Sequence, residues 1–248
     1  MTRDLTIDEL WDAARPAGRA FQPGQVAGLP EAARRYLVHA IAAGAPLAAA
    51  VRLRMHGEIR LKEWLPFTAE QVIHRERGMI WQATVRRGGI AIRGYDRLLD
   101  GAGVMRWRLF GMVPVMVASG ADVTRSAAGR VAAESVWLPS LLCDDAVSWA
   151  ARSPSHARAT LPVQGEMLEI ELTVGAGGRL EAVRLPRWGN PDGGVFRWVD
   201  FGGIVEEEGT FGGYTIPTRL RVGWHFHEGR FGPDGEFFRV TVDAATFR

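Results

Sequence analysis

Two reactive side chains are almost missing from this sequence. Its 248 residues include one cysteine, Cys143, and one lysine, Lys62. A lone cysteine excludes an internal disulfide and a thiolate metal cluster. The two aspartates that follow Cys143 disfavour a thiolate, so we expect a structural role for this residue. Lys62, in a predicted turn, is then the only side chain available for Schiff-base chemistry.

A long hydrophobic run and an excess of one charge are also missing. No segment approaches the roughly 18 apolar residues of a transmembrane helix. The N-terminal MTRDLTIDELWDAARP contains acids and no apolar signal-peptide core. Thirty basic and 28 acidic residues leave a net charge of +2, and arginines alternate with acids along the chain. We therefore expect a cytoplasmic protein that has no membrane span and binds no nucleic acid. We further expect a monomer or a weak homodimer.

Sequence motifs for familiar catalytic and nucleotide-binding sites are absent. The chain contains no G-x-S-x-G nucleophile elbow, no P-loop, no H-E-x-x-H helix and no G-x-G-x-x-G after a predicted strand. Glycine-rich stretches such as GAGG and PDGG lie between predicted strands, where they suit hairpin turns. No cofactor is therefore predicted.

Alternation of apolar and polar residues predicts a β-rich protein. In VRLRMHGEIRL, residues 51–61, the odd positions are mostly apolar and the even positions polar, which is typical of a strand with one wet face. Asp100-Gly101 predicts a hairpin turn. The apolar segment FGMVPVMV, broken by Gly111 and Pro114, suits an edge strand or a covering loop. Further strands are predicted over 68–75, 79–86, 90–93, 104–109, 146–150, 156–161, 166–174, 179–185, 196–201, 204–210, 218–226 and 236–242.

Three helices interrupt this pattern. Thr6 and Glu9 form a capping box that opens the first helix. Pro30 fits the first turn of a second helix that ends at Gly44. The third helix is RSAAGRVAAESVWLPSLL, with Ser126 as its predicted N-cap and its end near Trp137.

The order of these elements predicts a mainly β (α+β) fold. Strands at short spacing without alternating β–α units favour a large curved antiparallel sheet or open half-barrel. Two N-terminal helices and one mid-chain helix would pack on it. We predict a single domain over 1–248, with the N-terminal helices in 1–45, a first strand set in 51–110, the central helix in 125–142 and a second strand set in 146–248.

Several segments carry a family resemblance. LPEAARRYL, WLPFTAEQ, RSAAGRVAAESVWLP and GGYTIPTRLRVGW resemble an uncharacterised bacterial family that is described only as a domain of unknown function. The resemblance covers about residues 29 to 224 and implies no established activity. The order helix, strands, helix, strands is also similar to the LolA-type lipoprotein carriers. In those half-barrels a curved antiparallel sheet encloses an apolar cavity for acyl chains, so this similarity implies a hydrophobic ligand.

The central helix places one carboxylate on its apolar face. Glu134 lies three residues after Val131 and four before Leu138. One interpretation is structural: an ion pair with Arg130 or with a sheet arginine. The other interpretation is functional, because a carboxylate in an apolar pocket can act as a general acid or base.

Other candidate residues surround a predicted hairpin and the tryptophans. Asp96 could join Glu134 as a second catalytic carboxylate, and Arg93 and Arg106 could pair with Glu134 or orient an anionic group of a ligand. Salt bridges that hold the hairpin are the alternative reading of these residues. The aromatic rings predicted to form the core or to line a cavity include Trp81, Trp107 and Trp137.

His225 and His227 form an H-x-H pair on a predicted strand, so both rings would point to one face. This spacing can bind a metal. Two histidines that alternate on a strand are more often solvent-facing, however, and no metal site is predicted.

Two functions from different classes follow. The preferred hypothesis is binding of an apolar or amphipathic, lipid-like small molecule in a cavity between sheet and helices, where the tryptophans and the two sheet arginines would contact the ligand. The alternative is an enzyme of cyclase, isomerase or hydrolase type that acts on a hydrophobic substrate through Glu134 and Asp96. A third possibility, a structural or partner-binding module, would be favoured by a large apolar surface patch.

Overall fold

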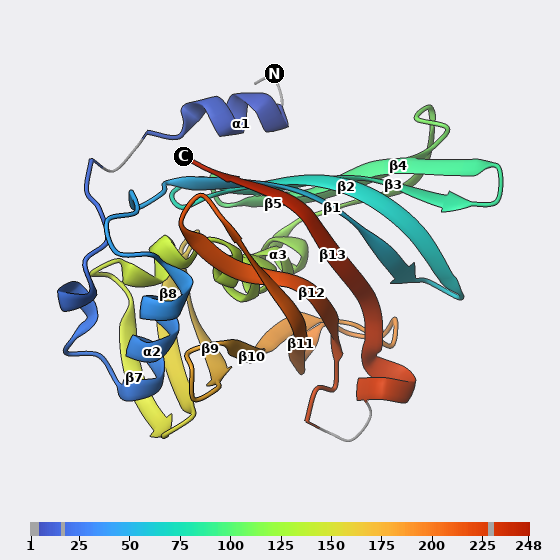
Figure 1. Cartoon of the computed structure of the whole chain (residues 1–248). Coiled ribbons are helices and arrows are strands. Elements are labelled where there is room, and N and C mark those ends of the chain that lie inside the picture. Colours follow the sequence, from blue (N-terminus) through green and yellow to red (C-terminus); the bar gives the residue numbers. More distant parts are fainter. Residues whose placement is uncertain (1–4, 16–17, 228–230) are drawn as a thin grey trace.

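One antiparallel sheet contains all thirteen strands found in the described residues of the computed structural model, which are 5–15, 18–227 and 231–248. The strand order is β6-β5-β4-β3-β2-β1-β13-β12-β11-β10-β9-β8-β7. The first six strands form one meander and the last seven form another, and pairing of β1 with β13 joins the two. The sheet curves and stays open (Figure 1), which confirms the predicted half-barrel. Its strands are β1 (Ala50–Arg60), β2 (Trp64–His74), β3 (Gly78–Arg87), β4 (Ile90–Leu99), β5 (Ala102–Leu109), β6 (Val113–Ser119), β7 (Ser148–Ser153), β8 (His156–Val163), β9 (Glu166–Val174), β10 (Leu180–Gly189), β11 (Arg197–Phe211), β12 (Tyr214–Trp224) and β13 (Glu236–Phe247).

The strand order explains where the central helix must lie. Strands β6 and β7 follow each other in the chain, yet they form the two opposite edges of the sheet. The segment between them therefore has to cross from one edge to the other. It does so along the concave face, as the α-helix α3 (Ala121–Glu134) followed by the 3-10 helices η2 (Ser135–Trp137) and η3 (Pro139–Cys143) (Figure 1).

The other two α-helices in the described residues lie before the sheet in the chain. Helix α1 (Ile7–Ala13) begins with the predicted capping box, in which Glu9 N–H donates to Thr6 Oγ1 at 3.2 Å. It packs on β2 and β3 from the side of the sheet opposite α3 (Figure 1). Helix α2 (Glu31–Ala40) packs against β8 and β9. None of the described helices is both long enough and apolar enough to cross a bilayer.

The predicted start of the central helix is wrong. Helix α3 begins five residues before Ser126, and its N-cap is Gly120 at a φ of 106°. Glycine adopts this conformation without a side-chain clash. Thr124 N–H then donates to Gly120 O at 2.9 Å, which closes the first turn. Beyond Glu134 the chain tightens into 3-10 turns, so the predicted helix to 142 is α-helical only in its first part.

One predicted break between strands is also wrong. The sequence predicts two strands, over 196–201 and 204–210, but β11 continues from Arg197 to Phe211 without a break between them. At the intervening Gly202, an added Cβ would lie 2.7 Å from the ring of Phe226. The glycine therefore makes room for an aromatic ring while the strand continues, rather than ending the strand.

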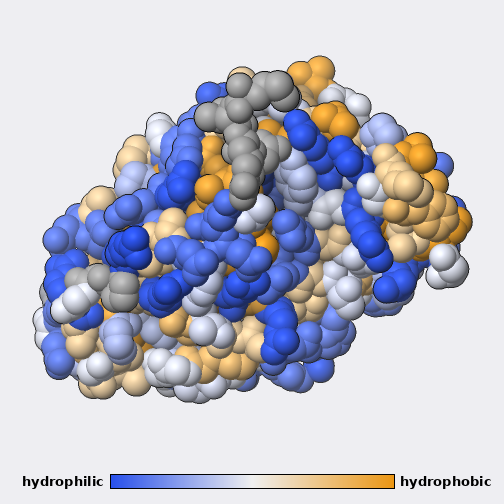
Figure 2. All heavy atoms as spheres, turned by 90° about the horizontal axis from the view of Figure 1, so that it is seen from above, coloured by the Kyte–Doolittle hydropathy of each residue, from blue (hydrophilic) through white to orange (hydrophobic). Residues whose placement is uncertain are grey.

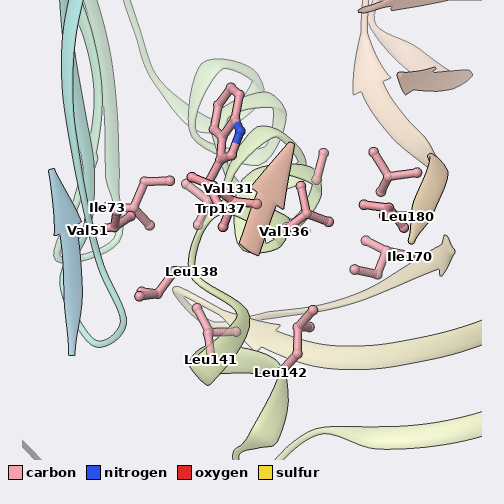
Figure 3. Packing of buried hydrophobic residues seen from close by; sticks show 14 of the residues in the cluster. Val51, Ile73, Val131, Val136, Trp137, Leu138, Leu141, Leu142, Ile170 and Leu180 are labelled. Carbon is pink, nitrogen blue, oxygen red and sulfur yellow. The ribbon is translucent and has the colours of Figure 1, made fainter. Parts of the chain in front are cut away.

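The central segment supplies the core that joins the two meanders. Its buried side chains include Val131, Trp137 and Leu138, which are at most 5% exposed. Figure 3 shows the central segment between Val51 and Ile73 of the first meander and residues of β9 and β10 in the second. Burying apolar surface on both sides fixes the distance between the two arms of the sheet.

Edge strand β6 leaves apolar side chains in solvent. It corresponds to the predicted edge segment FGMVPVMV and, among the described strands, pairs with β5 alone. Figure 2 shows hydrophobic surface at the end of the molecule toward which the β3–β4 and β5–β6 hairpins extend in Figure 1. An open apolar edge is a surface to which another strand or partner can add. Its exposed residues are Phe110, Met112, Val113, Val115, Met116 and Val117.

Candidate functional site

A cavity of about 350 Å³ lies between α3 and the concave face of the sheet. Its wall comes from α3, from η2 and from strands of both meanders. Most of the wall is apolar, and a few charged side chains reach it from α3, β4 and β10. The lining residues are Ile59, Met79, Trp81, Asp96, Arg97, Met105, Val123, Ser126, Ala127, Arg130, Ala133, Glu134, Val136, Trp137, Val183, Arg187, Asn190, Phe196, Phe201, Gly203, Leu220, Val222, Trp224, Phe237 and Phe238.

Arg130 is the centre of a largely buried charge network on this wall, in which the side chains are 13–17% exposed. Residues 130 and 134 are one helical turn apart, so Arg130 Nε reaches Glu134 Oε1 at 2.7 Å. Arg130 Nη1 donates to Asp96 Oδ2 on β4 at 3.1 Å. The guanidinium carbon also lies 4.9 Å from the ring centroid of Trp81. One arginine thus binds both predicted carboxylates and stacks on an aromatic ring.

The remaining carboxylate oxygens have donors of their own. Gln71 Nε2 donates to Glu134 Oε2 at 2.6 Å, and Trp107 Nε1 donates to Asp96 Oδ1 at 3.0 Å. Gly94 allows the Trp107 ring to lie against β4, because an added Cβ there would be 2.4 Å from the ring. All four carboxylate oxygens therefore accept a hydrogen bond from the protein. These hydrogen bonds reduce the free-energy cost of removing the charged groups from water.

The surroundings of Asp96 have opposing effects on its pKa. Burial raises the pKa of Asp96, while Arg130 and the Trp107 N–H lower it, and the net result is a pKa above the ordinary value. Burial has the larger effect because removal from water disfavours the charged form.

A second guanidinium, that of the partly exposed Arg187 on β10, also reaches the cavity. Its Nε donates to Ser126 O on α3 at 3.1 Å. Its carbon lies 4.6 Å from the ring centroid of Phe201 and 5.1 Å from that of Trp224. Gly129 of α3 faces the aliphatic part of Arg187, and an added Cβ there would be 2.9 Å from Arg187 Cγ. The helix therefore passes close over this side chain.

Arg187 differs from Arg130 in its electrostatic surroundings. Within the described part of the chain, no carboxylate lies within ion-pair distance of Arg187. Burial, and after it the charge of Arg130, lower the pKa of Arg187 to about 9. The side chain is nevertheless a cation at neutral pH, because its pKa is still above 7.

The structure brings five of the predicted site residues together. Glu134 and Asp96 meet through Arg130, as described above. Trp81 and Trp137 line the cavity, and the Trp137 N–H donates to Pro217 O at 3.0 Å. Trp107 lies behind Trp81, with ring centroids 5.7 Å apart, and contacts the network through Asp96.

Arg93 and Arg106 do not reach this cavity. They line a shallow groove on the other face of β4 and β5, together with Tyr95 and Arg108. The physical reason is the two-residue period of a strand: Asp96 faces the cavity, so Arg93, three positions away, faces outward. The expectation that a sheet arginine would pair with Glu134 is therefore not met by these two, and Arg130 pairs with it instead.

The predicted placement of the histidine pair on a strand is wrong. Strand β12 ends at Trp224, and His225 has a φ of 56°, outside the strand conformation. His225 is buried, and the backbone N–H of His227 donates to Asp200 Oδ2 at 2.8 Å. Over the described ranges, no group of three or more His, Cys, Asp or Glu side chains could hold a metal ion.

Arg187 and Gln71 are the residues that sequence analysis missed. A signal for Arg187 is present, because Val183, Leu185 and Arg187 alternate along β10 and the first two are buried. An arginine at the next inward position marks a charge directed at the core. Gln71 is fully buried at an inward position on β2, and its Oε1 has no hydrogen-bond partner in the structure.

A family model matches residues 19–235, which is most of the chain. It describes a family of unknown function, DUF6544. The chain belongs to the DUF6544 family. This result confirms the predicted membership of an uncharacterised family. A search of curated proteins finds no match to this DUF6544 chain.

Solved structures similar to this DUF6544 chain include two of the type expected from its architecture. One is a LolA superfamily protein from Nitrosomonas europaea, with 8% identity, a TM-score of 0.49, and coverage of 88% of this chain and 92% of the other. The other is a putative outer membrane lipoprotein-sorting protein domain from Vibrio parahaemolyticus, with 8% identity, a TM-score of 0.44, and coverage of 81% and 86%.

The raised pKa of Asp96 predicts how the stability of the protein changes with pH. In the folded DUF6544 chain Asp96 holds its proton to higher pH than in the unfolded chain. The contribution of Asp96 to the free energy of unfolding therefore falls as the pH rises from the unfolded pKa, about 3.9, through the folded pKa. Asp96→Asn removes this titration. We expect the unfolding free energy of the variant, relative to wild type, to increase between pH 4 and neutral pH in urea titrations. A difference that stays constant or decreases over this range would contradict the assignment.

Proposed function

We propose that this protein binds a lipid-like amphipathic small molecule in the cavity between α3 and the sheet. The observation that carries the proposal is the space itself. Protein interiors are close-packed, with few voids larger than one water molecule. A cavity of about 350 Å³ with a mainly apolar wall lies in the range of small-molecule sites and is much larger than an ordinary packing defect.

The helix that crosses the sheet leaves this space open. Ala127 and Ala133 of α3 both line the cavity, and neither has a side chain long enough to fill it. Opposite them lie large apolar side chains from the sheet, including Met79, Phe237 and Phe238. This arrangement supports an apolar ligand that occupies the place a larger helix side chain would otherwise take.

The cavity is partly open to the surface. Val123, Asn190 and Phe196 line it and are partly exposed, as are Phe237 and Phe238, whereas Met79 and Trp81 are buried. A ligand would enter past partly exposed residues, with its apolar part against the buried ones. Charged side chains on the wall explain why an amphipathic ligand is favoured over a purely apolar one.

The enzymatic alternative has weaker support. A general acid or base must exchange a proton with its substrate, within hydrogen-bond reach. Both oxygens of Glu134 and both oxygens of Asp96 already accept hydrogen bonds from protein donors. The two carboxylates therefore act first as structural partners of Arg130, and the cavity is better described as a binding site.

Substitutions on α3 that fill the cavity test the proposed function. Ala127→Phe places a phenyl ring in the space, so we expect it to weaken binding of the neutral fluorescent probe N-phenylnaphthylamine by at least about tenfold, or about 1.4 kcal/mol. Ala121→Phe adds the same ring at the exposed start of α3 and is the matched control, with unchanged affinity expected. Ala133→Leu provides a second blocked variant, and circular dichroism verifies that each protein is folded.

Native mass spectrometry of the protein purified from cells supplies an independent readout. A co-purifying small molecule in the wild type, absent from Ala127→Phe, is the expected result. If the wild-type protein neither retains a molecule nor binds the neutral probe, the proposed function is wrong. Equal probe affinity for the wild type, Ala127→Phe and Ala133→Leu would place binding elsewhere on the protein.

A further inference from the structure

Arg187 is a cation on the cavity wall that has no ionic partner within the described residues. Arg130 is bound by Asp96 and Glu134, and these two carboxylates are in turn fully hydrogen-bonded. Arg187 shares the same wall, but within the described residues it forms no ion pair. A charge that is only partly solvated and has no ionic partner within the described residues is unfavourable, and an anionic ligand would relieve that cost.

The contacts of Arg187 orient its guanidinium for this task. Its Nε is used by Ser126 O, and its carbon lies over the rings of Phe201 and Trp224. Its two Nη groups have no protein hydrogen-bond partner within the described chain, and neither is sealed from solvent. Gly129 keeps α3 close enough to hold the aliphatic part of the side chain in place. A guanidinium held in this way presents a fork of donors to a planar or tetrahedral oxyanion.

We propose that Arg187 binds the anionic head group of the ligand, so that the cavity selects a single-chain amphiphile ending in a carboxylate or a phosphate monoester. This inference rests on the proposed binding function and specifies its ligand class. The head group would lie at the Nη groups of Arg187, and the chain would run along the apolar wall formed by residues such as Met79, Phe237 and Phe238.

The charge network around Arg130 explains why the cavity would prefer an anionic head group to a cationic one. A cationic head group would need a carboxylate oxygen on the wall, but the oxygens of Asp96 and Glu134 are occupied by Arg130, Gln71 and Trp107. Bringing a second cation beside Arg187 would also add repulsion in a poorly solvated site. An anion instead relieves the unfavourable partial burial of Arg187, which is also the main cause of its lowered pKa.

Isothermal titration calorimetry with four probes of equal chain length tests the inference. The probes are decanoate, decyl phosphate, decanol and decyltrimethylammonium, added at neutral pH to the full chain after removal of bound lipid. We expect an anionic probe to bind about ten to one hundred times more tightly than decanol, as for a hydrogen bond to a charged group. The cationic probe should bind most weakly. Whether decanoate or decyl phosphate binds more tightly then identifies the head group.

Variants of Arg187 locate the selectivity. Arg187→Met keeps an apolar stem beside Gly129 and should reduce the preference for decanoate over decanol to less than about threefold, with little change for decanol. Arg187→Lys keeps the charge without the fork and should retain part of the preference. Arg184→Met is the matched control: it removes an arginine of the same strand that pairs with Asp200 on the other face, and the preference should remain.

The outcomes separate the two proposals. If decanol binds and decanoate binds no more tightly, the head-group assignment is overturned while the binding function stands. Full selectivity in Arg187→Met would also overturn it. If none of the four probes binds, the binding function itself fails and the head-group assignment with it. Selectivity that is lost in Arg187→Met and kept in Arg184→Met supports the assignment.

Discussion

Arg130→Met is expected to lower the free energy of unfolding by about 3–5 kcal/mol, because it leaves two largely buried carboxylates without their cation. Arg130 contacts Glu134 at 2.7 Å and Asp96 at 3.1 Å, and all three side chains are less than one-fifth exposed. The contact of the guanidinium with the Trp81 ring is lost as well. Urea titration at neutral pH measures the change directly.

Two further variants show whether burial of charge is the cause. Arg158→Met breaks an exposed pair between Arg158 and Glu169, at 2.9 Å, and should cost less than about 1 kcal/mol. Adding Asp96→Asn and Glu134→Gln to Arg130→Met neutralises both carboxylates and should recover a large part of the lost stability, since the uncompensated charges are then removed. A loss for Arg130→Met as small as that for Arg158→Met would mean that the network is solvated, in conflict with its burial.

The fold was largely predictable because its strands and turns are encoded by residues that are close together in the sequence. Alternating residues in β1 and the Asp100-Gly101 turn report directly on a strand and a hairpin, and the structure contains both. The start of α3 was missed because Gly120 acts as the N-cap through its backbone conformation, which no side-chain pattern reveals. The pairing of β1 with β13 is equally hidden, since it joins residues as far apart in sequence as Val51 and Phe247.

The candidate site was only partly predictable because it depends on long-range geometry. The place of Glu134 on an apolar helix face predicts a site residue, and the structure puts it on the cavity wall. Arg93 and Arg106 lie near Asp96 in the sequence, but the alternation of β4 and β5 directs them to the other face. Arg187 lies about 90 residues from Asp96 along the chain. Only the crossing of α3 over β10 places the two on one wall.

Trp137→Ala should also lower stability by about 3–5 kcal/mol, through a different cause. The indole is 5% exposed, packs where η2 joins the two meanders, and donates its N–H to Pro217 O at 3.0 Å. Truncation removes buried apolar area and leaves the carbonyl without its donor. In a chain of this length each kcal/mol lowers the melting temperature by roughly 2–4 °C, which differential scanning calorimetry resolves easily.

Two other tryptophan substitutions divide this loss into its parts. Trp198→Ala truncates a half-exposed indole and should cost less than about 1 kcal/mol. Trp137→Phe keeps an aromatic ring but removes the N–H, so its cost should be about 1–3 kcal/mol, the value for leaving a buried polar group unpaired. Because Trp137 also lines the cavity, Trp137→Ala enlarges it, and the variant should bind longer-chain probes relatively better than the wild type does. Equal losses for Trp137→Ala and Trp198→Ala would show that the joint between the meanders does not depend on this ring.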